Sequence, residues 1–304
     1  MRPIHCLTTC ILACVLASPL IVGCSEDELS PAPLPEVTDK VAFVSARDGN
    51  PEIYTVNIDG TGLKRLTDNV AIEDFPTWSP DGQHIAFQSN RTGSFEIYVM
   101  KADGSGVVQR TFSSRHSLGP TWSPDGNTIA YSTLSNGSAN IWKVGAFSGD
   151  PSLLFSAPGV DDLPDWSPDG TRLALSSDWN AYDFVTDIFL VNADGSEFTG
   201  LTGNIFDHID YTYPAWSPDG LKLSLAVVEN AGYNTEVGHI GLMSSDGSML
   251  TFFAPAAIRT RTSWSPDGQR IVYTSPTGDI AWITADASAS GTIITNGSNA
   301  DWHP

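Results

Sequence analysis

Alternating apolar and polar residues recur along this chain in runs of about six residues. In HIAFQS at 84–89 and RLALSS at 172–177, apolar residues occupy alternate positions, and β-branched or aromatic residues are frequent. This period of two is typical of a β-strand. A second run follows each first one, as EIYVMKADG at 96–104 follows HIAFQS, and a shorter third run comes after it. We therefore expect a chain built largely of short strands.

The five letters WSPDG precede each of these strand groups. In a hairpin turn, Pro fits the second position of a type I turn, Asp tolerates the next, and Gly takes the left-handed conformation that closes the hairpin. SPDG is thus predicted to join the first strand of each group to the second, and the Trp to fill the wedge between neighbouring groups. The motif recurs at 78–82, 122–126, 166–170, 216–220 and 264–268. A shorter turn is predicted between the third and fourth strands, at Asp59-Gly60, Asp103-Gly104, Asp194-Gly195 and Asp246-Gly247.

Four strands in about 44 residues is the period of a β-propeller blade. The stretch KVAFVSARDGNPEIYTVNIDGTGLKRLT at 40–67 has three of the four strands, and NADWHP at 299–304 ends in the missing Trp strand. The two ends complete one blade, and closing the ring removes exposed sheet edges. The predicted fold is all-β: a six-bladed propeller of four-stranded antiparallel blades over residues 40–304, closed by pairing of the N- and C-terminal strands.

These repeats carry a family resemblance. WSPDG followed by IAF and by IYxxxxDG resembles the repeats of the TolB-type propeller family, also called PD40 or WD40-like, and the resemblance covers residues 40–304. In that family, TolB is periplasmic and binds the peptidoglycan-associated lipoprotein. Similar propellers form the gate of prolyl-oligopeptidase-type peptidases, and one branch resembles oligogalacturonate lyase. The sequence departs from TolB because a lipobox and a short tether stand where TolB has an N-terminal α/β domain.

The first 24 residues resemble a lipoprotein signal peptide. Arg2 supplies a positive charge, an apolar stretch follows, and Ile21-Val22-Gly23-Cys24 resembles the bacterial lipobox. We expect a signal peptide at 1–23, a lipid on Cys24 and a disordered tether over 24–39, which is rich in acids and proline. The alternative is an ordinary signal peptide that happens to end near a cysteine. All four cysteines lie within residues 6–24, so the propeller can form no disulfide.

Charge narrows the choice of partners. The net charge of −20 and a pI near 4.3 argue against nucleic acid, which needs a basic surface, and against electrostatic docking on anionic lipid. The membrane is therefore expected to be contacted only through the lipid on Cys24. The negative charge either keeps the surface soluble or binds a cation or polycation, and the first interpretation is favoured.

Aromatic residues beside acids gather in the long loops of the fourth and fifth blades. Such clusters are typical of surfaces that recognise protein or sugar, because amphipathic rings anchor interfaces. The alternative is that the rings only pack these loops onto the rim. The predicted partner-binding residues are Trp179, Tyr182, Phe184, Phe206, Asp207, His208, Tyr211 and Tyr233.

A second candidate site is the mouth of the central channel. Asp74 and Asp162 begin innermost strands, while Arg259 and Arg261 lie in the sixth blade. An acidic arc facing a basic arc would bind a charged peptide or a cation, although solvated rim charge is the simpler interpretation.

Nothing in the sequence matches a known catalytic, metal or cofactor motif. The favoured hypothesis is a non-enzymatic, lipid-anchored scaffold for another envelope protein, on the periplasmic side or outer membrane of a bacterial envelope. The alternative is a carbohydrate-binding protein or a lyase-like enzyme on the loop-rich face, where His116 and His208 could converge on a metal.

Overall fold

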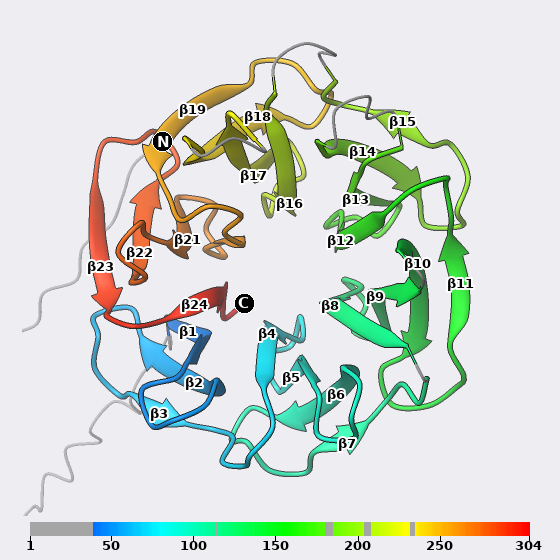
Figure 1. Cartoon of the computed structure of the whole chain (residues 1–304). Helices are drawn as coiled ribbons and strands as arrows, with labels where there is room; N and C mark the ends of the chain where they lie inside the picture. Colours follow the sequence, from blue (N-terminus) through cyan, green and yellow to red (C-terminus); the bar gives the residue numbers. More distant parts are fainter. Residues whose placement is uncertain (1–38, 114, 136, 180–184, 204–207, 232–234) are drawn as a thin grey trace, which may run out of the picture. The chain divides into compact units, whose positions relative to one another are not determined.

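The computed structural model describes residues 39–304, apart from 114, 136, 180–184, 204–207 and 232–234. The described residues form 24 strands in six four-stranded antiparallel sheets arranged as a ring (Figure 1). This arrangement confirms the predicted six-bladed propeller. Blade 1 contains β24 (Ser298–Trp302), β1 (Lys40–Ser45), β2 (Glu52–Asn57) and β3 (Lys64–Arg65), from the channel outward.

The other five blades follow in chain order, each from its innermost strand outward. Blade 2 is β4 (Glu73–Trp78), β5 (His84–Ser89), β6 (Glu96–Lys101) and β7 (Val108–Gln109). Blade 3 is β8 (His116–Trp122), β9 (Thr128–Ser135), β10 (Ser138–Gly145) and β11 (Ser152–Phe155). Blade 4 is β12 (Asp161–Trp166), β13 (Arg172–Ser177), β14 (Asp187–Asn192) and β15 (Thr199–Gly200). Blade 5 is β16 (Asp210–Trp216), β17 (Lys222–Glu229), β18 (Val237–Ser244) and β19 (Thr251–Pro255). Blade 6 is β20 (Thr262–Trp264), β21 (Arg270–Thr274), β22 (Ile280–Thr284) and β23 (Ser290–Ile294).

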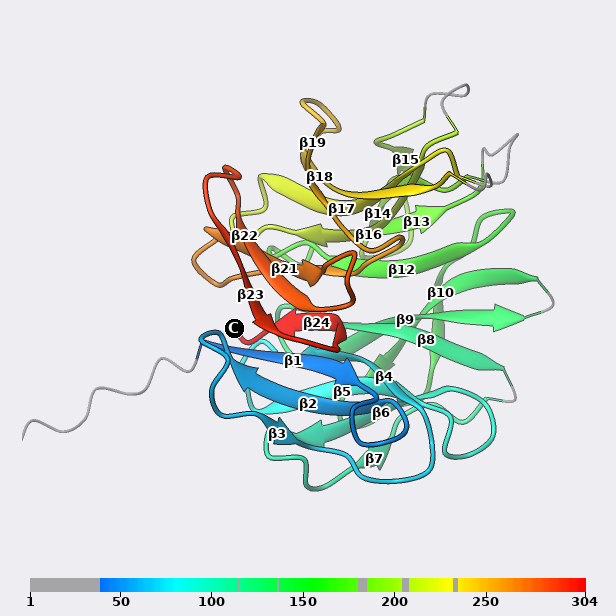
Figure 2. The ribbon, with the colours of Figure 1, turned by 60° about the vertical axis from the view of Figure 1, so that its left-hand side comes forward.

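The two ends of the propeller chain close the ring in blade 1. β24 pairs antiparallel with β1, in the register Val41↔Trp302, and the two strands lie side by side in Figure 2. Asp39 strengthens the closure: its carboxylate accepts a hydrogen bond from Trp302 Nε1 and pairs with Arg270 at 2.7 Å. The predicted pairing of terminal strands is therefore confirmed.

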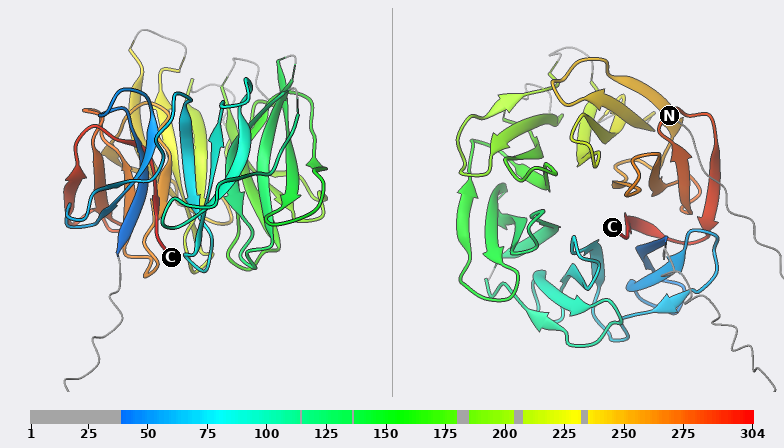
Figure 3. Two further views of the ribbon diagram at one scale, coloured as in Figure 1. Left: turned by 90° about the horizontal axis from the view of Figure 1, so that it is seen from below. Right: turned by 180° about the vertical axis from the view of Figure 1, so that it is seen from behind.

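The SPDG hairpins lie together at one end of the ring, which we call the turn end; the opposite end, where innermost strands begin, is the loop end (Figure 3). In each hairpin the Asp side chain accepts hydrogen bonds from its own turn. Asp169, for example, accepts from Ser167 Oγ at 2.6 Å and from Thr171 N at 3.0 Å. The Gly that follows has a positive φ, 70° at Gly170, which a side chain would strain. The predicted turn chemistry is confirmed.

Apolar residues of adjacent blades form the core, and the motif Trp lies in the wedge between them. Trp122 packs against Ala86 and Ile97 of the preceding blade, and its Nε1 donates to the carbonyl oxygen of Thr77 at 3.1 Å. Trp264 makes the same bond to Ala215 in blade 5. Because these side chains are buried between blades, they fix the spacing of the innermost strands around the channel.

Candidate functional site

The innermost strands share a distortion that re-aims side chains toward the channel. In β4, β8, β12 and β16 the pairing register shifts between the second or third residue of the strand and the residue just before the motif Trp. Bulges of this kind redirect side chains and gather near functional sites. Three residues before the Trp, the backbone has a positive φ at Phe75, Gly119, Leu163, Tyr213 and Asn299. The sixth blade has Arg261 at this position.

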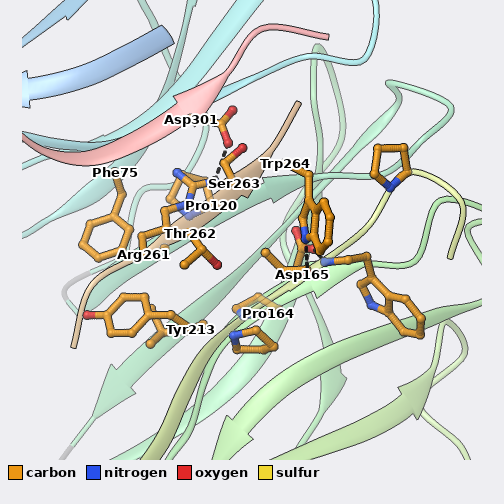
Figure 4. Close-up of a pocket in the computed structure, with 16 residues that line it drawn as sticks. Phe75, Pro120, Pro164, Asp165, Tyr213, Arg261, Thr262, Ser263, Trp264 and Asp301 are labelled. Carbon is orange, nitrogen blue, oxygen red and sulfur yellow. Dashed lines mark hydrogen bonds and ion pairs between the residues drawn. The ribbon is translucent and has the colours of Figure 1, made fainter. Parts of the chain in front are cut away.

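Two of these strained residues meet across the channel. The rings of Phe75 and Tyr213 stack with centroids 6.1 Å apart and planes 11° from parallel (Figure 4). They come from β4 and β16, which lie on opposite sides of the ring in Figure 1. Burial, together with the nearby carboxylates of Asp162 and Asp74, raises the pKa of Tyr213 to about 12, so its hydroxyl stays protonated. The pair narrows the channel toward the loop end.

A cavity of about 170 Å³ lies in the channel, and its walls include Phe75, Tyr213 and Pro218 of an SPDG turn. Among the described residues that line this cavity, Arg261 is the one with a positively charged side chain. Arg261 donates to the carbonyl oxygen of Pro76 at 2.6 Å and pairs with Asp301 at 3.1 Å. The guanidinium is therefore held in place by two neighbouring blades.

The residue just before the motif Trp links one blade to the next. Asp165 accepts a hydrogen bond from Trp216 N at 2.8 Å, and Asp301 accepts one from Trp78 N at 2.8 Å. Asp165 also accepts from Thr121 Oγ1 at 3.1 Å, so it joins three blades. Burial deep in the ring raises the pKa of Asp165 to about 6, although the carboxylate still borders the cavity. This site thus contains one arginine and two carboxylates, those of Asp165 and Asp301.

The predicted channel-mouth residues each have a partner in the structure. Arg259 pairs with Asp210 at 2.9 Å, just as Arg261 pairs with Asp301. Asp74 accepts a hydrogen bond from Asn299 Nδ2 at 2.8 Å, and Asp162 accepts one from the hydroxyl of Ser132. Burial raises the pKa of both carboxyls. The two arginines are therefore paired with carboxylates, whereas the two aspartates accept hydrogen bonds from neutral side chains.

The predicted partner-binding residues are only partly described. Trp179 is 49% exposed, and its ring also packs edge-on against Phe189 and Phe198 at the outer rim. His208 is half-buried, with a positive φ, and its carbonyl oxygen accepts from Ala231 N. Tyr211 is only 7% exposed and belongs to the core between blades 4 and 5. Outside the described residues lie Tyr182, Phe184, Phe206, Asp207 and Tyr233.

The sequence analysis did not single out Phe75, Tyr213, Asp165 or Asp301 as site residues. They occupy the first and third positions before the motif Trp, and the cavity is lined from the three positions that precede this Trp in successive blades. In the described part of the chain, no group of three or more His, Cys, Asp or Glu side chains could hold a metal ion. That part also contains no helix long and apolar enough to cross a membrane.

Solved structures with this fold include TolB from Acinetobacter baumannii. The two share 19% sequence identity and a TM-score of 0.75, over 88% of this chain and 67% of the other. An oligogalacturonate lyase in complex with manganese has a TM-score of 0.60 at 13% identity, over 85% of this chain and 74% of that one. At these identities the likeness concerns the fold alone.

Two curated relatives have higher sequence identity to this chain over short stretches. The Tol-Pal system protein TolB of Geobacter sulfurreducens is 46% identical over 48 residues, which span 16% of this chain and 11% of that relative. The family model described as the TolB beta propeller domain, PD40, matches residues 20–196, more than half of the chain. The chain belongs to the TolB β-propeller family.

Proposed function

We propose that this chain is a non-enzymatic scaffold of the bacterial cell envelope that binds another envelope protein. The observation that carries the proposal is the match to the TolB propeller family over more than half of the chain. Two relatives that match over short stretches are named Tol-Pal system protein TolB. Matches over such short stretches do not show that this chain binds the partners of those relatives. The kind of partner is therefore inferred from the surface of this propeller.

The loop end and the channel supply the features that a protein partner needs. Trp179 offers a large ring that is half exposed and already held against Phe189, so little side-chain entropy is lost on binding. The cavity beyond Phe75 and Tyr213 is of side-chain size and combines apolar walls with the fixed charges of Arg261 and Asp301. A partner could anchor on the rim tryptophan and place one side chain at the channel.

Anchoring through Cys24 is the second part of the proposal. The lipobox-like Ile21-Val22-Gly23-Cys24 supports it, and the propeller begins at Lys40, which leaves a tether of about fifteen residues. Mass spectrometry of the mature N-terminus tests the modification. A diacylglycerol on Cys24, lost in Cys24→Ser together with membrane association, is expected; an unmodified N-terminus would remove the anchor from the proposal.

Co-purification from native envelope tests the scaffold function. The bait is the wild-type protein, compared with a variant in which Trp179, Tyr182, Phe206 and Tyr211 are changed to Ala. Because Tyr211 lies in the core, Trp179→Ala alone serves as a second variant that leaves the core intact. We expect a specific protein with the wild type that is lost with both variants. Recovery of no specific protein would contradict the scaffold function.

A carbohydrate-binding or lyase-like activity is the alternative, because propellers titled oligogalacturonate lyase share the fold. Titration of the protein with Mn²⁺ alone, followed by calorimetry, tests it. Tight binding that disappears when His116 and His208 are both changed to Ala would favour the lyase-like alternative over the scaffold.

A further inference from the structure

Blade 3 departs from the repeat at the turn between its third and fourth strands. In the other five blades this turn contains an Asp whose carboxylate accepts hydrogen bonds from the residue two positions later, as Asp103 accepts from Ser105 N at 2.9 Å. In blade 3 the connection between β10 and β11 is AFSGDP at 146–151, which has Phe147 in place of this Asp. It presents Phe147, whose side chain is 58% exposed. A local break in a regular pattern is where function is expected.

Phe147 lies over the junction of blades 2 and 3 at the turn end. Its ring centroid is 4.9 Å from that of His84 and 6.1 Å from that of Trp122. The ring also lines a cavity of about 400 Å³ between two SPDG turns, with Pro80, Asp81, Pro124 and Asp125 on the other walls. An exposed aromatic ring and two carboxylates therefore border the same space.

These two aspartates lack the arginine or lysine that three other blades provide, although His84 makes a smaller contribution that lowers the pKa of Asp81. Two residues after the Gly of SPDG, blades 4, 5 and 6 have Arg172, Lys222 and Arg270, each of which lowers the pKa of its own turn aspartate. Blades 2 and 3 have His84 and Thr128 at that position. Hydrogen bonds from their own turns still hold the pKa of Asp81 and Asp125 below the usual range, so both are ionised at neutral pH.

The same position shows how the propeller itself fills such a space. The Arg172 guanidinium lies over the Trp216 ring at 5.3 Å, and that of Arg270 over the Trp302 ring at 4.8 Å. In both cases an arginine beside an SPDG turn stacks on the motif Trp of the next blade. The corresponding Trp122 instead has Phe147 beside it, next to an open cavity. The junction of blades 2 and 3 thus has the aromatic rings and the carboxylates, but it has no arginine beside them.

We propose that this groove, formed by Phe147, Asp81, Asp125 and the two prolines, binds an arginine side chain from a basic segment of a partner protein. The guanidinium would lie against the Phe147 ring and donate to the two carboxylates. Arginine suits the groove better than lysine because its planar fork can stack and donate to a carboxylate at once. The site lies at the turn end, so it goes beyond the loop-end partner surface proposed above and does not depend on it.

Amide chemical shifts of the intact protein test the proposal, with N-acetyl-arginine amide as the probe and N-acetyl-lysine amide as its comparison. We expect shifts concentrated at Gly82, Gly126 and Phe147, with weaker binding of the lysine probe. Phe147→Ser is expected to weaken arginine binding about fivefold, the equivalent of a cation–π contact of about 1 kcal/mol. Asp125→Asn, which keeps the oxygen that the turn needs, is expected to weaken it severalfold.

Matched variants decide the outcome. Asp219→Asn changes the same turn in blade 5, and Phe112→Ser removes another exposed phenylalanine; neither is expected to alter binding. Equal shifts at the glycines of all five SPDG turns, equal binding of the two probes, or unchanged binding in Phe147→Ser would each overturn the proposal. The readout needs no envelope partner, so a failed co-purification leaves this test intact.

Discussion

The carboxylates of the turn end and those of the loop end and channel are held in opposite ways. At the turn end, Asp169 bonds only within its own turn, to residues two positions away. At the loop end, Glu73 accepts from Asn69, Ser89 and Arg91, and in the channel Asp301 bonds to Trp78 across the chain closure. The carboxylates of the turn end therefore shape single hairpins, whereas those of the loop end and channel join separate segments and blades.

The difference reverses the direction of the pKa shift. Short hydrogen bonds in an exposed turn favour the charged form, and the pKa is lowered at Asp59, Asp81, Asp103, Asp125, Asp169, Asp194, Asp219, Asp246, Asp267 and Asp286. Burial favours the neutral form, and it raises the pKa at Asp74, Glu96, Asp161, Asp162 and Asp165. The repeat thus builds a permanently charged end, while burial keeps carboxyls nearer neutrality at the other end and along the channel.

The largest difference between the ends is expected from removing one carboxylate of each kind. Glu73→Ala leaves Arg91 without the buried carboxylate 2.9 Å away, and breaking such a pair costs about 3 kcal/mol of unfolding free energy. Asp125→Asn keeps the turn's acceptor and should change it by less than about 0.5 kcal/mol. Urea denaturation of both variants measures the contrast. Equal losses would show that removing the buried Glu73 carboxylate costs no more than neutralising a turn carboxylate.

A smaller effect is expected at Asp165. Its pKa of about 6 lies above the value near 3.9 of an unfolded chain, so between about pH 4 and 6 the folded state binds more protons. Unfolding free energy therefore falls as pH rises through this window. Asp165→Asn can donate to Thr121 and accept from Trp216, and it should remove about 1–2 kcal/mol of that fall.

Thermal or urea unfolding of Asp165→Asn beside the wild type, at pH 4.5 and pH 8, checks this result. The other buried carboxyls give both proteins a residual slope, so only the difference between them counts. A variant that is less stable than the wild type at pH 8 by more than at pH 4.5 would contradict the shift.

At the turn end the sign reverses. The pKa of Asp169 is lowered to about 2, so its contribution to stability is present above about pH 4 and is lost as pH falls toward 2. Asp169→Asn cannot be protonated in this range and should lose less stability on acidification. Circular dichroism during acid titration measures the two curves; identical acid limbs would argue against a contribution from this turn.

A small effect on stability is also expected at Trp179. Its ring touches Phe189 and Phe198 only edge-on and is half exposed, so Trp179→Ala should lower the unfolding free energy by less than about 1 kcal/mol. Phe189→Ala, at a buried position in the same cluster, is the comparison and should cost several times more. If the two losses were equal, Trp179 would be a packing residue rather than an available binding ring.

The same contrast explains what could be predicted from the sequence. SPDG turns and the motif Trp were predicted correctly because their bonds are local or repeat in every blade. The channel residues were not predicted from the sequence. Position 75 and the equivalent positions of the other five blades hold Phe, Gly, Leu, Tyr, Arg and Asn, which share no chemistry. What five of the six share is a bulge and a positive φ, imposed by the packing of neighbouring blades. Likewise, only the folded core reveals that Tyr211 is buried while Trp179 is exposed.

Which end binds the envelope partner is tested most directly by site-specific photo-crosslinking in intact cells. A photoreactive phenylalanine analogue would replace Trp179 at the loop end or Leu221 at the turn end, two exposed positions in blades 4 and 5. The proposed function predicts a discrete protein adduct from position 179 and none from position 221, which lies in blade 5 and outside the arginine groove between blades 2 and 3. An adduct from position 221 alone would place the partner on the turn end and contradict the assignment of the loop end as the binding surface.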